Sequence, residues 1–145
     1  MSEPPFEFLE DVTSDLCFVA RGGSLSAVFA AAAEALLAAT LEEPAALRET
    51  ERQPLELTEP DLELLLLAFL NELVFLRDAR QLLLRPRELR VETRPAGARL
   101  RAELVGERID PSRHRLLADV KAATAHGLKL AFEAGRFRAT VTLDV

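Results

Sequence analysis

Several residue types are scarce in this chain of 145 residues. It has no tryptophan and no tyrosine, one cysteine (Cys17) and two histidines. A single cysteine cannot form an intramolecular disulfide or a cysteine-based zinc site, so a reducing compartment is the simplest setting. We expect Cys17 to be a small buried hydrophobic residue. Two histidines outside any CxxC or HExxH pattern argue against zinc chemistry.

Lysine is scarce as well. Only Lys121 and Lys129 are lysines among 18 basic residues, and 24 acidic residues bring the formal net charge to -6. A broad electrostatic hold on nucleic acid requires Lys and Arg gathered on one face. The composition therefore argues against DNA binding and predicts that any role in RNA chemistry is indirect.

No apolar run in the sequence is long enough to cross a membrane. The longest, Leu64 to Leu70, is far shorter than the roughly 20 residues that a spanning helix requires. The first residues, Met1 to Pro5, lack the positive start and apolar run of a signal peptide. With 49% hydrophobic and 29% charged residues, the chain has the composition of a globular domain. We therefore expect a soluble, cytoplasmic protein with a single domain over residues 1–145.

Hydrophobic periodicity predicts an α+β fold. Strands are expected at 6–9, 16–20, 47–57, 89–93, 98–104 and 137–145, with a long alternating segment at 116–132 that is interrupted or bulged at Gly127. One helix should begin after the N-cap Ser24 and end near Thr40, and a second should begin at a Thr58 cap and end near Arg77. This order predicts two helices packed on a mainly antiparallel or mixed β-sheet.

The second helix is apolar on more than one side. Leu64, Leu67 and Phe75 project opposite its main apolar stripe, where a surface helix would be polar. This face is either covered by another layer or offered to a partner.

Carboxylates are expected to gather at the end of the last strand. That strand alternates strictly, so Asp144 faces away from the core, and Val145 follows it with a free carboxylate. Asp11 and Asp15 lie in the turn between the first two strands. If the last strand pairs near Asp15, these groups converge and could hold a hard cation such as Ca²⁺ or Mg²⁺. Solvated acids that bind nothing are the alternative.

Other polar residues carry weaker predictions. His126 alternates in phase with apolar neighbours, which predicts a buried core histidine, and His114 is expected in a turn. Lys121 should face the other way beside Asp119, either in a solvated ion pair or in contact with a phosphate or a partner's acid. The Gly-Gly-Ser segment before the first helix favours helix capping over anion binding. We find no candidate catalytic residue, because nothing resembles an activated nucleophile.

Five segments, in order, match one family. They are Val12-Thr13-Ser14-Asp15, Phe69-Leu70-Asn71-Glu72, Asp110-Pro111-x-x-His114, Asp119-Val120-Lys121-Ala122-Ala123-Thr124-Ala125-His126 and the final Asp144-Val145. Through them almost the whole chain resembles the archease family, small proteins that assist the RtcB-type RNA ligase. The chain departs from the family pattern at Val12, which replaces a histidine, at Ala125, which replaces a tyrosine, and at Ala68, where an acid is common.

The resemblance implies a function and a site. It implies a non-enzymatic activator of a GTP-dependent RtcB-type RNA ligase in tRNA splicing or RNA repair, which promotes guanylylation of the ligase and its multiple turnover. It also implies a divalent metal, with Ca²⁺ favoured, held by Asp15, Asp144 and Val145. Lys121 and Asp11 are candidates for contact with the partner or with phosphate. The alternatives are a general protein-binding or chaperone-like module and a small phosphate-handling hydrolase.

Overall fold

The computed structural model describes residues 3–9 and 15–145. The elements in chain order are β1 (Phe6–Leu9), β2 (Leu16–Gly22), α1 (Leu25–Thr40), the short 3-10 helix η1 (Pro44–Ala46), β3 (Glu51–Glu59), α2 (Leu62–Arg80), β4 (Leu82–Arg94), β5 (Gly97–Arg108), β6 (Ala122–Glu133) and β7 (Arg136–Asp144). The candidate residue Asp11 and the departure at Val12 lie outside the described residues.

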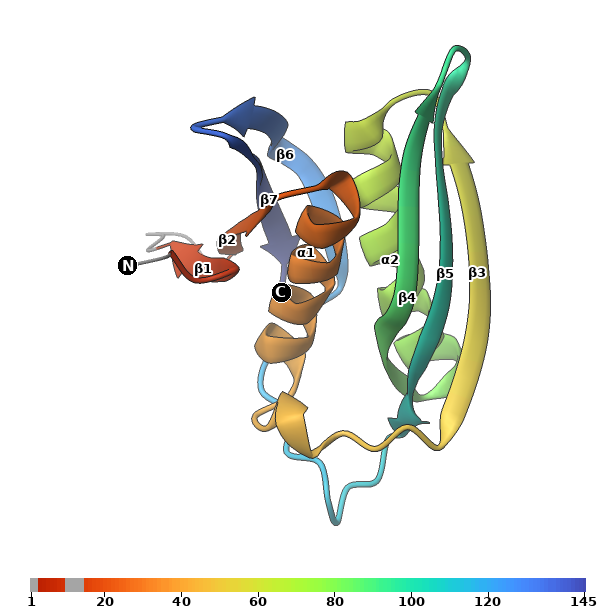
Figure 1. Cartoon of the computed structure of the whole chain (residues 1–145). Coiled ribbons are helices and arrows are strands. Elements are labelled where there is room, and N and C mark those ends of the chain that lie inside the picture. Colours follow the sequence, from red (N-terminus) through yellow and green to blue (C-terminus); the bar gives the residue numbers. More distant parts are fainter. Residues whose placement is uncertain (1–2, 10–14) are drawn as a thin grey trace.

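The strands form two separate sheets. The four-stranded sheet has the order β1-β2-β7-β6, the three-stranded sheet has the order β3-β5-β4, and every strand pair in both is antiparallel. Both helices lie between the sheets (Figure 1) and contact strands of each. The predicted α+β fold with two helices on antiparallel structure is confirmed. The sequence did not indicate that the strands divide between two sheets.

This sandwich explains why the helices are apolar on several sides. Phe29 of α1 stacks on Phe69 of α2 with ring centroids 6.2 Å apart, and both rings are fully buried. Leu67, on the predicted far face of α2, is partly buried against the same core, whereas Leu64 and Phe75 remain 42% and 57% exposed. No helix in the described part of the chain is long and apolar enough to span a membrane.

The two helix starts differ in how well the sequence predicted them. Ser24 caps α1 as expected, because its hydroxyl accepts a hydrogen bond from the backbone N–H of Ala27 at 3.0 Å. The prediction that Thr58 caps α2 is wrong. Thr58 belongs to β3, which pairs with β5 through Glu59, and Asp61 caps the helix instead by accepting from Leu64 N at 2.8 Å. The helix also continues to Arg80, beyond the predicted end.

Several strand boundaries also need correction. β4 begins at Leu82, before the predicted residue 89, and β5 ends at Arg108, after the predicted residue 104. The strand expected from residue 47 begins at Glu51, because Pro44 opens η1 and Leu47 is buried in a small second cluster. The strand expected from residue 116 begins at Ala122. Before it, the N–H groups of Leu117 and Ala118 donate to carbonyls in the last turn of α1, so this segment caps a helix rather than extending a sheet. The hairpin of β4 and β5 is confirmed.

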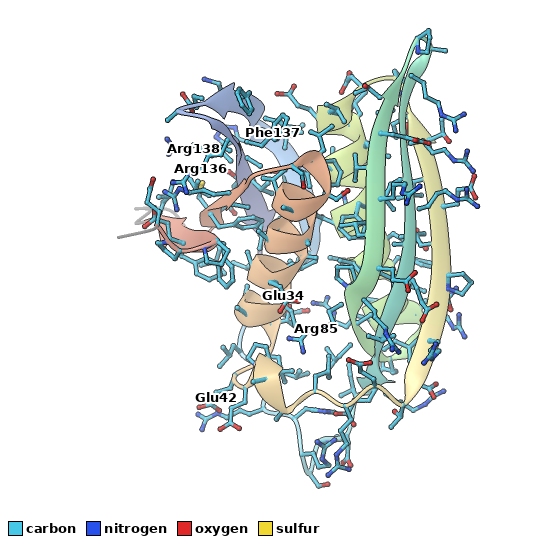
Figure 2. All side chains as sticks on the ribbon, viewed as in Figure 1. Glu34, Glu42, Arg85, Arg136, Phe137 and Arg138 are labelled. Atoms are coloured by element: carbon cyan, nitrogen blue, oxygen red, sulfur yellow. The ribbon has the colours of Figure 1, made fainter. Side chains whose placement is uncertain are left out.

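An ion pair joins the helical layer to the three-stranded sheet. Arg85 on β4 donates from Nε and Nη2 to the two carboxylate oxygens of Glu34 on α1, at 3.1 and 3.0 Å, and Figure 2 shows the two side chains facing each other across the layer boundary. A bidentate pair of this kind is directional as well as charged. It therefore helps to fix how α1 lies against β4.

Candidate metal and partner site

Strand pairing and one backbone hydrogen bond bring four of the predicted site residues to one strand end. Leu16 of β2 lies opposite Leu143 of β7, so Asp15 and Asp144 are the next residues outward at the same end of these antiparallel strands. On the other side of β7, the backbone N–H of Lys121 donates to the Asp144 carbonyl at 2.7 Å. We call Asp15, Lys121, Asp144 and Val145 the strand-end site.

The strand end is anchored in the core while its acids face outward. Val141 and Leu143 of β7 are fully buried, and Val145 packs partly against the same core. Asp144 alternates with them and is exposed, and Asp15 is half-buried. The prediction that Asp144 faces away from the core is therefore confirmed.

The donor chemistry of this site suits a hard cation. Its groups are the carboxylates of Asp15 and Asp144 and an oxygen of Val145, which is the ligand type that Ca²⁺ prefers. Ca²⁺ takes roughly 6 to 8 oxygen ligands, so water or a partner would have to supply the rest. Within residues 3–9 and 15–145, no group of three His, Cys, Asp or Glu side chains is placed to hold a metal. Metal binding at the strand-end site therefore stays a prediction.

We expected Asp119 to lie beside Lys121, but its ion pair is with Arg77. Its carboxylate lies 3.6 Å from Nη2 of Arg77 on α2, while Arg77 also pairs with Asp78 at 2.8 Å and donates to the Val120 carbonyl. The residues before Ala122 are outside the regular strand, so simple alternation does not place their side chains. Lys121 itself is exposed.

The prediction of a core histidine at position 126 is wrong. His126 is exposed, because the pairing of β6 with β7 shifts register between Thr124 and Lys129. Gly127 in this interval has a positive φ of 66°, which favours glycine and bends the strand. Ala125, where the family has a tyrosine, is exposed in the same interval, and Ala68 is partly buried on α2.

Cys17 is half-buried rather than buried. It lies on β2 opposite Thr142 of β7, on the face turned away from the helices, while its neighbour Phe18 points into the core and is fully buried. The apolar run around Cys17 indicated burial on both faces of the strand. Only the face of β2 that meets the helices is part of the main core.

A buried polar cluster around Glu107 escaped sequence reasoning. The Glu107 carboxylate accepts hydrogen bonds from Arg48 N at 3.0 Å, from Arg113, and from His114 Nε2 at 2.9 Å. These bonds, that from Arg113 above all, lower the pKa of Glu107 from its ordinary 4.5 to about 2, although burial opposes the shift. Arg48 is distant in the sequence, and although Arg113 and His114 follow Glu107 closely, no local pattern indicated that their side chains turn back onto it.

His114 belongs to this cluster and has a structural role. It lies directly after the turn at 111–113 rather than within it, and its side chain is buried. The backbone N–H of Asp110 donates to Nδ1 at 2.9 Å, so the ring proton is on Nε2, which donates to Glu107. The Asp110-Pro111-x-x-His114 motif thus locks the connection after β5.

Asn71, in a second family-like motif, also has a clear structural task. Its side-chain carbonyl accepts from Ala123 N at 2.8 Å and its amide donates to Ala123 O at 3.0 Å. Nearby, Glu63 accepts from Leu130 N at 2.9 Å. Since β6 is the last strand of its sheet, these side chains of α2 replace a missing neighbouring strand.

Fold and site together define a class: a small α+β domain with two helices between antiparallel sheets and acidic groups at an exposed strand end. The Archease protein family matches residues 6–145. The chain is 33% identical over 134 residues to the protein archease of Pyrococcus abyssi, covering 92% of this chain and 94% of that one. It is 34% identical to the archease of Methanosarcina mazei, covering 97% and 95%.

Solved structures agree. The solution structure of protein 1598 of Methanobacterium thermoautotrophicum superposes with a TM-score of 0.84 at 32% identity, covering 97% of this chain and 99% of that one. The crystal structure of an archease from Thermotoga maritima, described as a possible chaperone, has a TM-score of 0.63 at 18% identity over 100% of this chain and 98% of that one, which supports the fold alone. The chain belongs to the archease family.

Proposed function

We propose that this protein is a non-enzymatic activator of an RtcB-type RNA ligase in tRNA splicing or RNA repair, acting in the cytoplasm. In this proposal it promotes guanylylation of the ligase by GTP and its multiple turnover. The strand-end site is the part that docks beside the ligase active centre. RNA is contacted only indirectly.

One observation carries the proposal: β2, β7 and the segment before β6 bring Asp15, Asp144 and Lys121 to a single exposed end. Guanylyl transfer develops negative charge on phosphate oxygens, and fixed positive charge beside them lowers the barrier. Lys121 has such a charge on an exposed side chain. A divalent ion, when bound by Asp15, Asp144 and Val145, would supply the second. Membership of the archease family supports this assignment, because the resemblance of the sequence to that family implies the ligase as partner.

The incomplete ligand set also supports an accessory role. The strand-end site offers the carboxylates of Asp15 and Asp144 and an oxygen of Val145, which leaves some of the roughly 6 to 8 oxygen positions of Ca²⁺ open to a partner's carboxylate or phosphate. A site of this kind binds its cation more tightly in the complex than alone. We therefore expect the ligase and the metal to raise each other's affinity for this protein.

The test is ligase guanylylation and multiple turnover, measured with this protein and its Asp15→Ala, Asp144→Ala and Lys121→Ala variants. We expect each to lose most of the stimulation. Glu56→Ala is the matched control, because Glu56 is an exposed strand acid on the other sheet. If Asp15→Ala and Asp144→Ala stimulate as well as Glu56→Ala, the strand-end site has no such role.

Metal binding is tested separately by titrating Ca²⁺ into the isolated protein. Asp144→Asn should weaken binding strongly because a neutral amide replaces a charged ligand. Adding a Gly-Ser extension after Val145 should also weaken it, because the extension converts the carboxylate of Val145 into an amide. Unchanged affinity in the extended protein would remove Val145 from the ligand set.

A general protein-binding or chaperone-like role is the second candidate. It is favoured by Leu64 and Phe75 of α2, which remain 42% and 57% exposed despite the two covering sheets. Suppression of aggregation of unrelated unfolded clients, lost in Phe75→Ser and unaccompanied by ligase stimulation, would select this function. Stimulation of the ligase by Phe75→Ser at the normal level would favour the first.

A further inference from the structure

Three arginines meet on the outer face of the four-stranded sheet, at the opposite end from the strand-end site. Arg21 of β2 lies directly opposite Arg138 of β7, and Arg136 is two residues along the same face of β7. Figure 2 shows Arg136 and Arg138 together on the side away from the helices, with Phe137 on the other side. We call Arg21, Arg136 and Arg138 the arginine cluster. It borders a pocket of about 220 Å³ lined also by Glu3, Glu133 and Ala134.

Like charges opposite each other on neighbouring strands repel, so the arginine cluster needs anions. Arg21 is nearly enclosed, with 7% of its side chain exposed, and it pairs with Glu7 and, at 3.1 Å, with Glu3. Arg136 pairs with the other oxygen of Glu3. Arg138 lies 4.0 Å from Glu133, at the limit of an ion pair. Glu3 is thus the carboxylate that joins two of the three arginines.

Glu3 has the properties of a displaceable anion. It precedes β1 rather than lying within a strand, and 58% of its side chain is exposed. Exposed ion pairs contribute at most about 1 kcal/mol, because water competes and side-chain freedom is lost. The enclosed Arg21 keeps Glu7 as its partner when Glu3 moves away. An external anion of higher charge can therefore take its place without disturbing the sheet.

We infer that the arginine cluster binds a phosphate group, whose position the Glu3 carboxylate occupies in this structure. A phosphate monoester carries up to two negative charges and offers three oxygens in different directions, so it can contact all three guanidinium groups, whereas a planar carboxylate reaches two. Phe137 is turned to the other face, so the outer side of β7 at this position offers no ring for base stacking. The site therefore recognises the phosphate and not a nucleobase.

The phosphate site goes beyond the proposed ligase activation. Arg138 and Asp144 are six residues apart on β7, or about 20 Å at the rise of a strand, so the two sites do not share a ligand. The chain's net charge of -6 argues against a broad polyanion surface but not against one local site. Phosphate binding is measurable without ligase, GTP or divalent metal, so it can fail or succeed independently.

Binding can be followed by calorimetry or by backbone amide shifts at low ionic strength, using the whole chain with EDTA present. The probes are inorganic phosphate, a short RNA with a 5′-phosphate, and the same RNA dephosphorylated. Glu3→Gln should raise the affinity for the two phosphate probes several-fold. Arg136→Gln with Arg138→Gln should lower it by roughly tenfold or more, because charge-assisted contacts are lost. Arg52→Gln with Arg101→Gln, which removes two exposed arginines of the other sheet, is the charge-matched control and should have no effect.

The three probes distinguish the possible sources of the phosphate. Equal binding of inorganic phosphate and phosphorylated RNA assigns the site to the free ion or any phosphate group, and tighter binding of the phosphorylated RNA assigns it to an RNA end. No binding by the Glu3→Gln variant, or binding unaffected by the double arginine change, overturns the inference. Tighter binding of an acidic peptide than of either phosphate probe also overturns it, since the cluster would then be a protein contact.

Discussion

The outer faces of the two sheets arrange charge in opposite ways. On the three-stranded sheet opposite charges are interleaved and paired. Arg52 and Glu103 are 2.9 Å apart across β3 and β5, and Arg99 and Glu56 are 2.5 Å apart across the same strands. On the four-stranded sheet the charges separate along β7, with Arg136 and Arg138 at one end and Asp144 at the other.

This difference is the basis for placing both proposed binding sites on the four-stranded sheet. Paired charges neutralise one another and keep a face soluble, so they leave little field for a ligand. Charges of one sign gathered at one end of a strand cost stability unless other groups neutralise them, as Glu7 does for Arg21. The edges differ too. Pro54 and Pro86, which have no N–H to donate, lie within the outer strands of the three-stranded sheet, whereas side chains of α2 cover the free edge of β6.

The largest effect is expected at Glu107, the one acid in this comparison of the two sheets that is buried. Glu107 lies on β5 of the three-stranded sheet but accepts three hydrogen bonds out of solvent. Glu107→Ala leaves those donors without an acceptor and should lower the free energy of unfolding by about 3 kcal/mol. Urea denaturation measures this. Glu103→Ala, four residues earlier on the same strand, should cost no more than about 1 kcal/mol. Equal losses would mean that the Glu107 cluster contributes nothing special.

Acid should weaken the same cluster. The pKa of Glu107 is about 2 in the folded chain and 4.5 ordinarily, so its stabilisation is complete above pH 4.5 and is lost as the pH falls toward 2. Hydrogen bonds from Ser112 lower the pKa of Asp110, which adds a loss of the same sign. Denaturation midpoints of Glu107→Gln should therefore fall less steeply over this interval than those of the wild type. Parallel pH profiles would contradict the assignment.

The edge of the four-stranded sheet should be the next most sensitive feature. Asn71→Ala removes both hydrogen bonds to Ala123 and leaves a strand N–H and C=O without protein partners. We expect a loss of about 2 kcal/mol and faster hydrogen exchange at the Ala123 amide. Asn71→Asp keeps an acceptor for the N–H and should cost less. Exchange at Ala123 that is unchanged in Asn71→Ala would show that the edge is protected by other means.

The smallest effect is expected on the paired face. Glu56→Gln, which removes the partner of Arg99, should change the free energy of unfolding by no more than about 1 kcal/mol. Asp144→Asn should be similarly mild in stability but should abolish ligase stimulation. Thermal denaturation and the guanylylation assay, run on both variants, complete the comparison. A large stability loss in Glu56→Gln would mean that the paired charges are structural after all.

Local patterns predicted the elements that depend on local chemistry. Strict alternation predicted that the Asp144 side chain faces solvent, and the capping side chain of Ser24 predicted where α1 begins. Alternation cannot show which strands pair, so the division into two sheets was not foreseen. The same limit explains His126, whose exposure depends on a register shift against β7. At the start of α2, both Thr58 and Asp61 suit a cap, and the pairing of β3 with β5 decides between them.

The candidate site, too, was predictable in its residues but not in their proximity. Its residues were identified by type, by alternation and by family resemblance, but their proximity depended on the pairing of β2 with β7, which the sequence left conditional. The Glu107 cluster could not be predicted, because Arg48, Arg113 and His114 approach it only in the folded chain. Asn71 was noticed within a motif, while its role emerged from the free edge of β6.

The pairing of Leu16 with Leu143 joins the two ends of the described chain in the centre of one sheet. Contacts between residues so distant in sequence form slowly, because a long loop must close before they contribute. The strand-end site is complete only when that closure is complete. A ligand bound at the strand-end site should therefore hold β2 and β7 together and slow global unfolding. Resistance to proteolysis should then rise with the occupancy of the site.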